Sequence, residues 1–365
     1  MPERVVIKLA VHQDVEKMKA HRPSNIAVLM TQGIGDVVCS TVIISGLRKA
    51  YPDCSITGIL KSKIEASVFG GTTALDGVIF FDPNKPQSAA QKAHFVWKIV
   101  RSRFDTFIVP TDLDAIKSPL LALISGASNR VGERAASAGR FYTRSVPRDV
   151  TEHKVLSNRR IVDAAGGAND ALPSVYYSDD DRQFIESFLQ RHGLAAHEKP
   201  LVIIHPGSGP VEHHKRWNRN GFARAASLLE AESNAAVIFV GGRDEVALCD
   251  EIVAKVPGGA ISVAGKFELR QTAALFRLAA AALGSDSGMM HVAAAVGAPT
   301  VVIFGPTDPS RTAPFHASKI LWKKIHCSPC YPGLPLGCGN TVCLEQITPN
   351  EVVEAVKSVM SASLQ

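Results

Sequence analysis

Short apolar runs rich in β-branched residues alternate along the chain with segments whose apolar residues recur at helical spacing. Such runs predict buried parallel strands, and the helical spacing predicts helices that cover the sheet. The first half predicts strands at 26–30, 55–61, 77–82 and 105–112, a strand edge or turn at 129–134, and helices at 37–52, 87–102 and 116–124. The second half predicts strands at 201–204, 235–242, 260–265 and 299–306, and helices at 221–233, 244–256, 269–283 and 348–362. This alternation is typical of an α/β fold with helices on both faces of a parallel sheet.

The alternation restarts after a polar stretch at 178–198, so the chain is predicted to contain two similar α/β units. We expect domains at 24–178 and 179–347, an N-terminal extension at 1–23 and a final helix in 348–365. A length of 365 residues agrees with two domains, because single cores stop growing before that size. Ligands of open parallel sheets bind beyond the carboxyl ends of the strands, and the motifs below follow apolar runs.

Composition and charge narrow the classes of partner. Hydrophobic residues make up 46% of the chain and charged residues 20%, which is typical of a globular protein. The net charge of +6 fits either an ordinary basic surface or a face that meets an anionic partner. No Lys/Arg block carries interleaved aromatic residues, so we expect no nucleic acid partner. No apolar run is long enough to span a bilayer, so we expect a cytoplasmic protein whose membrane contact is at most peripheral.

The first motif is TQGIGD, at residues 31–36, between a predicted strand and helix. Gly33 and Gly35 allow a close approach of backbone and ligand. Asp36 at the helix entry is interpreted either as a carboxylate that stabilises the helix or as a general base that faces a cleft. The third glycine of a dinucleotide fingerprint is missing, which argues against a nicotinamide-dependent dehydrogenase.

The second motif is HPGSG, at residues 205–209, after the apolar run LVII. The amides of its glycines and the Ser208 hydroxyl suit phosphate oxygens, and Lys215 adds a cation shortly afterwards. A solvated loop with surface cations is the alternative. Glu245 follows FVGG at a later strand–helix junction, where it could contact ribose hydroxyls or stabilise the helix start.

The third motif is GSDSGMMH, at residues 284–291, between two alanine-rich segments that the pattern predicts to be helical. Ser287 and Gly288 at a helix N-terminus would form an anion site. Asp286 would repel phosphate, so it is better suited to accept hydrogen bonds from sugar hydroxyls. His291 is interpreted either as a donor contact or as an ordinary buried histidine. The motif therefore indicates a site for a sugar attached to a phosphate.

Together, GIGDVVCSTVIISGLRKAYPDCSITGIL, the KRW after HPGSG and GSDSGMMHVAAAVGAPTVVIFGPTDP resemble the heptosyltransferases of glycosyltransferase family 9. The resemblance covers about residues 24–360 and is densest at 201–310. It implies a GT-B architecture of two facing Rossmann-like domains, with the C-terminal helix returning to the first. The first domain would bind the acceptor, and the second would bind the nucleotide-sugar donor.

The resemblance also implies an inverting transfer that needs no metal cofactor, typically from ADP-heptose to the inner core of lipopolysaccharide. By position, Asp36 matches the general base, and Ser208 and Lys215 match donor-phosphate contacts. Asp286 matches the carboxylate that binds the donor sugar, and Ser287 and Gly288 match its phosphate loop. Glu245 matches the acidic residue near the ribose. A related transferase acting on a protein or small-metabolite acceptor, and a catalytically silent nucleotide-binding subunit, are the alternatives. The sequence does not indicate the oligomeric state.

Four cysteines lie in a loop rich in Gly and Pro before the final helix, and their spacing suits a tetrahedral metal such as zinc or iron. A structural metal is one interpretation, and reduced thiols or disulfides are the others. The four are Cys327, Cys330, Cys338 and Cys343.

Overall fold

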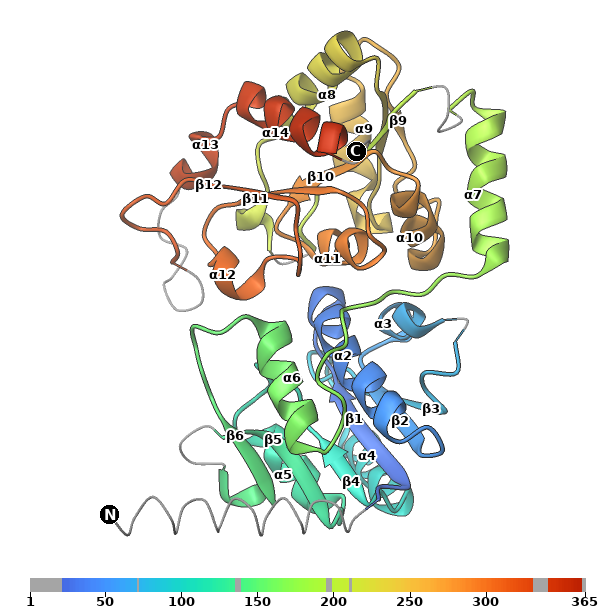
Figure 1. Ribbon diagram of the computed structural model, residues 1–365, viewed down its shortest axis with the longest axis vertical. Coiled ribbons are helices and arrows are strands. Elements are labelled where there is room, and N and C mark those ends of the chain that lie inside the picture. The colour runs from blue at the N-terminus through green and yellow to red at the C-terminus, as the bar shows by residue number, and fades with distance from the viewer. Residues whose placement is uncertain are drawn as a thin grey trace.

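The computed structural model describes residues 22–70, 72–134, 139–194, 199–209, 212–330 and 341–362. Within these residues the chain forms two separate six-stranded parallel sheets, one above the other in Figure 1. We call the half built on the first sheet (residues 25–164) the first lobe and the half built on the second sheet (residues 179–362) the second lobe. The predicted α/β class, with two similar halves, is therefore confirmed.

The first sheet has the strand order β3-β2-β1-β4-β5-β6. Its strands are β1 (Asn25–Met30), β2 (Ser55–Leu60), β3 (Gly77–Phe80), β4 (Thr106–Ile108), β5 (Asn129–Arg134) and β6 (Arg144–Pro147). Its helices are α2 (Ile34–Ala50), α3 (Lys63–Ala66), α4 (Ala89–Arg101), α5 (Lys117–Ile124) and α6 (Lys154–Ala164).

Strand β1 lies in the middle of this sheet and is buried on both faces. Its alternate side chains separate into two cores: Val28 joins the cluster that contains the buried faces of α2 and α6, whereas Leu29 joins the cluster beneath α4 and α5. A strand covered on both faces reads as a continuous apolar run, which is why the sequence IAVLM predicted it.

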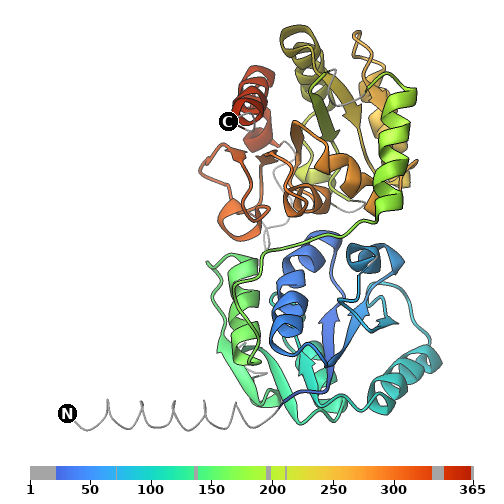
Figure 2. The same ribbon diagram turned by 45° about the vertical axis from the view of Figure 1, so that its right-hand side comes forward.

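The second sheet has the strand order β12-β11-β10-β7-β8-β9. Its strands are β7 (Leu201–His205), β8 (Ala236–Phe239), β9 (Ile261–Ser262), β10 (Ala281–Ser285), β11 (Thr300–Phe304) and β12 (Lys319–Trp322). Its helices are α7 (Asp179–Arg191), α8 (Arg219–Ser233), α9 (Val246–Val253), α10 (Leu269–Arg277), α11 (Gly288–Ala295), α12 (Pro309–Thr312), α13 (Val342–Glu345) and α14 (Pro349–Ala362). The chain passes from one lobe to the other between α6 and α7, as Figure 2 shows.

The expected return of the C-terminal helix to the first domain is wrong. Helix α14 packs on α8 and on strands β10 and β11 of the second sheet, on its outer side in Figure 1. The apolar stripe of the helix, which includes Val352, Val356 and Val359, is buried there in one cluster with Trp217. Because this stripe is already covered, the helix has no apolar face left for the first lobe.

The predicted helix over 269–283 is also wrong at its end. Helix α10 ends at Arg277, and residues 281–285 form β10 between β7 and β11. Alanine favours helices by intrinsic propensity. Here Ala281 and Ala282 lie in a fully buried central strand that is covered by helices on both faces, where their small side chains fit. The tertiary environment therefore outweighs the local preference. The elements that the pattern did not predict include β6, α6 and β12.

None of the helices formed by the described residues has both the length and the apolar character needed to cross a membrane.

The indole of Trp217 joins the second sheet to the C-terminal segment. It is 2% exposed, its Nε1 donates a hydrogen bond to the carbonyl of Ile347 at 3.1 Å, and its backbone N–H donates to the Ser285 hydroxyl at 3.0 Å.

We expect Trp217→Ala to lower the free energy of unfolding by about 3–5 kcal/mol, because it leaves a cavity and an unpaired carbonyl. Urea unfolding followed by circular dichroism measures this. Trp97→Ala, which truncates an exposed indole, should stay within about 0.5 kcal/mol of the native chain. An equal effect of both substitutions would contradict the assignment.

Candidate functional site

The two lobes meet where α2 follows β1 and α11 follows β10, at the carboxyl ends of the two central strands. A Cβ atom added to Gly288 would lie 3.0 Å from the backbone nitrogen of Gly35, and one added to Gly35 would lie 3.1 Å from the ring of His291. A side chain at either glycine would therefore require its neighbours to shift. The contact brings the neighbours of the two glycines, Asp36 and Ser287, to the same junction.

Asp36 lies in the first turn of α2 with its side chain 30% exposed. One carboxylate oxygen accepts a hydrogen bond from Lys154 Nζ at 2.6 Å. Burial opposes the charge of Lys154, but Asp36 and Asp112 outweigh it and raise the pKa of this amine above its usual value. The lysine is therefore a fixed cation that holds the Asp36 carboxylate in place.

The lysine also joins Asp36 to a charge network that crosses between the lobes. Lys154 Nζ lies 3.6 Å from Asp112, and Asp112 in turn contacts Arg311 of α12 at 3.1 Å and Arg148 at 3.1 Å. Despite its burial, Asp112 has a pKa below the usual range, because these three cations stabilise its charge. The network fixes the entrance of α6 against α12 of the opposite lobe.

His291 is buried at the contact between α2 and α11. Its Nδ1 lies 3.6 Å from Sγ of Cys39 on α2. Burial lowers the pKa of His291 to about 4 and raises the pKa of the Cys39 thiol to about 12, so both groups are neutral near pH 7. Of the two interpretations of His291, this geometry favours the buried histidine, which here packs between the lobes.

In the second lobe a buried chain of hydrogen bonds joins three polar residues. Oε2 of Glu245 lies 3.0 Å from Nε2 of His205, and Nδ1 of His205 lies 3.0 Å from the Ser287 hydroxyl. Burial opposes ionisation of Glu245, but the hydrogen bonds from His205 and from the Gly242 amide keep its pKa at about 2. The ionised carboxylate accepts a hydrogen bond from Nε2–H of His205, and Nδ1 of the same ring faces the Ser287 hydroxyl.

Asp286 lies beside this chain and is 5% exposed. Its Oδ2 accepts a hydrogen bond from the Thr307 hydroxyl at 2.7 Å and lies 3.5 Å from Lys215 Nζ. Lys215 also contacts Glu212 at 2.6 Å. The ammonium group is therefore already held between two carboxylates next to the N-terminus of α11.

The Ser208 hydroxyl contributes to the shape of its own loop. It donates to the carbonyl of Glu212 at 2.6 Å and accepts from Nε of Arg216 at 3.2 Å. Arg216 also lies 3.6 Å from Glu245. Ser208 therefore connects the HPGSG turn to the backbone of Glu212 and to the side chain of Arg216.

The structure brings the predicted residues Ser208, Lys215, Glu245, Asp286, Ser287 and Gly288 to the carboxyl edge of the second sheet, with Asp36 opposite them. Glu245 points inward and is 4% exposed, whereas its neighbour Asp244 is the exposed carboxylate of that turn. The sequence interpretation missed His205, although the residue is part of HPGSG. It also missed Lys154, because nothing near that residue in the sequence relates it to Asp36.

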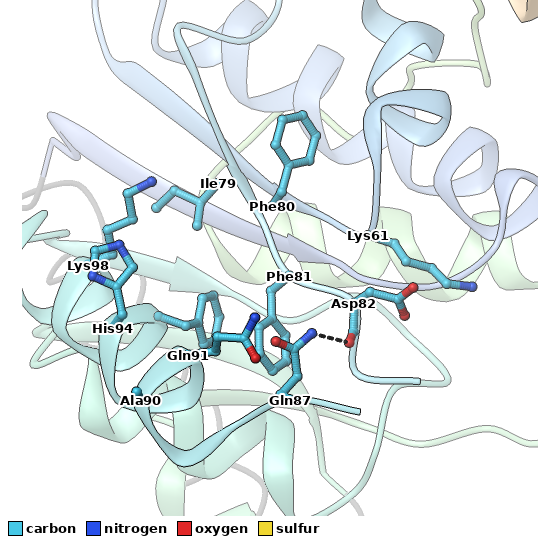
Figure 3. Close-up of a pocket in the computed structure, with 11 residues that line it drawn as sticks. Lys61, Ile79, Phe80, Phe81, Asp82, Gln87, Ala90, Gln91, His94 and Lys98 are labelled. Atoms are coloured by element: carbon cyan, nitrogen blue, oxygen red, sulfur yellow. Dashed lines mark hydrogen bonds between the residues drawn. The ribbon is translucent and has the colours of Figure 1, made fainter. Parts of the chain in front are cut away.

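A separate pocket of about 460 Å³ lies in the first lobe between β3 and α4 (Figure 3). Lys61 and Asp82 follow directly after β2 and β3, so the pocket opens at the same edge of the sheet as Asp36. Phe80, His94 and Lys98 also line it. An aromatic surface with nearby cations suits an anionic carbohydrate.

The cysteine cluster is only partly described. Cys327 is exposed, Cys330 is partly buried and Cys343 is buried, whereas Cys338 lies outside the described residues. Within the part of the chain that the structure describes, no three His, Cys, Asp or Glu side chains come together as a metal site. The structural zinc or iron at this cluster stays a prediction.

The model of glycosyltransferase family 9 (heptosyltransferase) matches residues 93–333. The chain belongs to glycosyltransferase family 9. The family assignment makes this protein a glycosyltransferase, as the sequence motifs predicted. A lipopolysaccharide core heptosyltransferase, OpsX, of Haemophilus influenzae is 24% identical over 303 residues, which cover 80% of this chain and 82% of that protein.

The solved structures that resemble this family 9 chain confirm its GT-B fold. A family 9 glycosyltransferase of Veillonella parvula superposes with a TM-score of 0.76 and 21% identity, over 93% of this chain and 97% of the other. The ADP-heptose lipopolysaccharide heptosyltransferase II of Escherichia coli superposes with a TM-score of 0.73 and 21% identity, over 93% of this chain and 100% of the other.

The lowered pKa of His291 predicts a specific pH dependence of stability. Between pH 6.5 and about 4 the unfolded chain protonates this histidine and the folded chain does not, so stability falls as the pH decreases through that window. The contribution is up to about 3 kcal/mol. We expect His291→Gln to remove it, as measured by urea unfolding at several pH values. The control His192→Gln, at an exposed histidine of α7, should keep the native profile. Identical profiles for the native chain and His291→Gln would contradict the burial argument.

Proposed function

We propose that this family 9 glycosyltransferase moves a heptose from ADP-heptose to a hydroxyl of the lipopolysaccharide inner core, with inversion at the anomeric carbon. The name of the Haemophilus influenzae relative supports the acceptor, and the name of the Escherichia coli structure supports the donor. The observation that carries the mechanism is the contact between Gly35 and Gly288, because it brings a carboxylate of one lobe to the anion site of the other.

The donor diphosphate would bind at the N-terminus of α11. Free amides at a helix start and the positive end of its dipole attract an anion. The Ser287 hydroxyl and the Lys215 ammonium would add donors to the same phosphates, with His205 and Glu245 as positioning residues for Ser287. We propose that Ser208 holds the shape of this loop and acts on the donor phosphate indirectly, through that shape. In this proposal Glu245 does not contact the ribose directly. It stabilises the turn at Gly242, and that turn would lie beside the ribose.

The sugar would lie between Asp286 and Asp36. Asp286, held by Thr307 and Lys215, would accept hydrogen bonds from sugar hydroxyls. Asp36 would accept the proton of the acceptor hydroxyl while the new bond to the anomeric carbon forms. The bond from that carbon to the diphosphate oxygen breaks at the same time, and the nucleoside diphosphate leaves with the electron pair. A single displacement of this kind inverts the anomeric centre.

The charge that develops on the leaving diphosphate would be met by Lys215, by the Ser287 hydroxyl and by the amides of α11. Donors that are fixed in place before the reaction stabilise such a charge without reorganisation. We therefore propose that the transfer needs no divalent cation.

The acceptor would approach along the carboxyl edge of the first sheet. The pocket beside β3 lies two strands from β1, which is about 10 Å across a sheet. Lys61 and Lys98 at this pocket would attract the anionic groups of a lipopolysaccharide core, and a lipid-anchored acceptor would bring the protein to the inner face of the membrane.

We expect Asp36→Asn to lower the rate of transfer by about 100-fold or more, because the amide cannot take the acceptor proton. Binding of ADP, measured by calorimetry, should stay near the native value, since the anion site lies on the other lobe. The matched control is Asp149→Asn, at an exposed carboxylate of the same lobe that accepts hydrogen bonds from Thr151. Turnover within about threefold of the native rate would remove Asp36 from the role of base.

We expect Lys215→Ala to weaken ADP binding by about 10- to 100-fold, which corresponds to the loss of a charge-assisted hydrogen bond. Titration calorimetry measures this directly. Lys255→Ala is the control, because Lys255 is an exposed lysine of the same lobe that pairs with Glu251. An unchanged dissociation constant for the Lys215 variant would exclude this residue from the donor site.

A further inference from the structure

Helix α5 exposes more of its large apolar side chains than an ordinary surface helix does. The side chains that it buries against the sheet are small: Ser118, Pro119 and Ala122. Of its large aliphatic side chains, Leu121 packs partly buried against the core, whereas Leu120, Leu123 and Ile124 are each about 40% exposed. An amphipathic helix that serves only the fold places its large apolar residues against the core. The outward face of α5 therefore needs another explanation.

The apolar surface continues onto the neighbouring helix α4 and onto the residue before α5. Trp97 and Val100 of α4 are 52% and 48% exposed, and Ile116 is 61% exposed. Residues His94 and Lys98 line the pocket beside β3, so Val100 lies on the opposite flank of α4, toward α5. We define the α4–α5 face by its exposed apolar residues, which are Trp97, Val100, Ile116, Leu120, Leu123 and Ile124.

Positive charge accompanies this face. Neither α4 nor α5 contains an Asp or Glu residue. Besides Lys98, which lines the pocket on the other flank of α4, the exposed cations on these two helices are Lys92, Arg101 and Lys117. A nearby acidic residue, Asp114, lies 3.8 Å from Lys117. A large apolar patch bordered by cations, with an indole at its edge, is the composition that binds the interface of an anionic bilayer.

We propose that the α4–α5 face rests on a lipid bilayer that contains anionic lipids. Charge argues against two other occupants. Residues 1–21 contain four Lys or Arg and three Asp or Glu, so this segment does not complement a basic face, and a second copy of the chain carries the same net charge of +6. Both helices lie in the part of the first lobe away from the second sheet in Figure 1. A bilayer at this face therefore leaves the junction between the lobes open.

Co-sedimentation of the full chain with vesicles tests the proposal without donor or acceptor, so it can fail independently of the proposed transfer. We expect at least about tenfold more binding to phosphatidylcholine vesicles that contain phosphatidylglycerol than to phosphatidylcholine alone, and a strong decrease at high salt. The double substitution Leu120→Glu and Leu123→Glu should lower binding to the anionic vesicles by about tenfold or more. The control Leu172→Glu, at another exposed leucine, should bind as the native chain does. Equal binding by the native chain and the double variant would overturn the proposal.

Trp97 provides a second readout that does not depend on the double variant. Its emission should shift to shorter wavelength when anionic vesicles are added, because the indole leaves water. Trp97→Phe should still bind the vesicles but lose the shift, because Trp217 is buried and Trp322 lies at the end of β12 in the second lobe, away from the α4–α5 face. No shift in the native chain would count against the proposal. Without vesicles, a clear loss of thermal stability in the double variant, or its change from oligomer to monomer, would show that protein covers the face and would also overturn the proposal.

Discussion

The close approach of α2 and α11 is the constraint on which the site depends. The backbone of Gly35 and the Cα of Gly288 meet so closely that a Cβ atom on either residue would lie 3.0–3.1 Å from its nearest neighbour. Each of these glycines stands one position from a polar residue, Asp36 on one lobe and Ser287 on the other. Because the helices begin at this contact, their N-terminal amides and the Asp36 carboxylate converge on one small volume. The same volume is bounded by His291, whose neutrality lets it pack between the lobes without a counter-ion.

The polar residues around this contact are held by partners that are themselves buried. A buried polar group costs free energy unless it is hydrogen-bonded, and most of these groups have such a partner. Oε1 of Glu245 is an exception among the described residues, because it accepts no hydrogen bond. Glu245 fixes His205, which fixes Ser287, and Thr307 fixes Asp286. On the facing lobe Lys154 fixes Asp36. This prior ordering is what allows such groups to stabilise charge without moving when a reaction occurs.

The parts of the fold that the sequence predicted well are those with a strong local signal. Strand β1 and the strands β7, β8 and β11 are continuous apolar runs. Helix α2 ends at Ala50, close to the helix end that the sequence predicted at Pro52. The two errors have different sources: one came from a local helical preference that packing between distant segments overrode, and the other from the family resemblance. The alanines of β10 looked helical, and α14 was expected on the first lobe although its stripe fits the second. At the site, the motif residues were found because each follows a strand, whereas Lys154 and Arg311 carry no motif.

The sequence by itself determined the α/β alternation, the family and most of the polar residues of the donor side, because these are encoded in contiguous stretches whose spacing has local physical meaning. Only the tertiary structure decided which residues act on one another. Glu245 turned inward to His205, Asp36 gained a lysine 118 positions away, and Leu120 and Leu123 of α5 came to lie exposed. The physical reason is that burial, charge pairing and exposure are properties of surroundings assembled from segments far apart in the chain, and no local pattern specifies them.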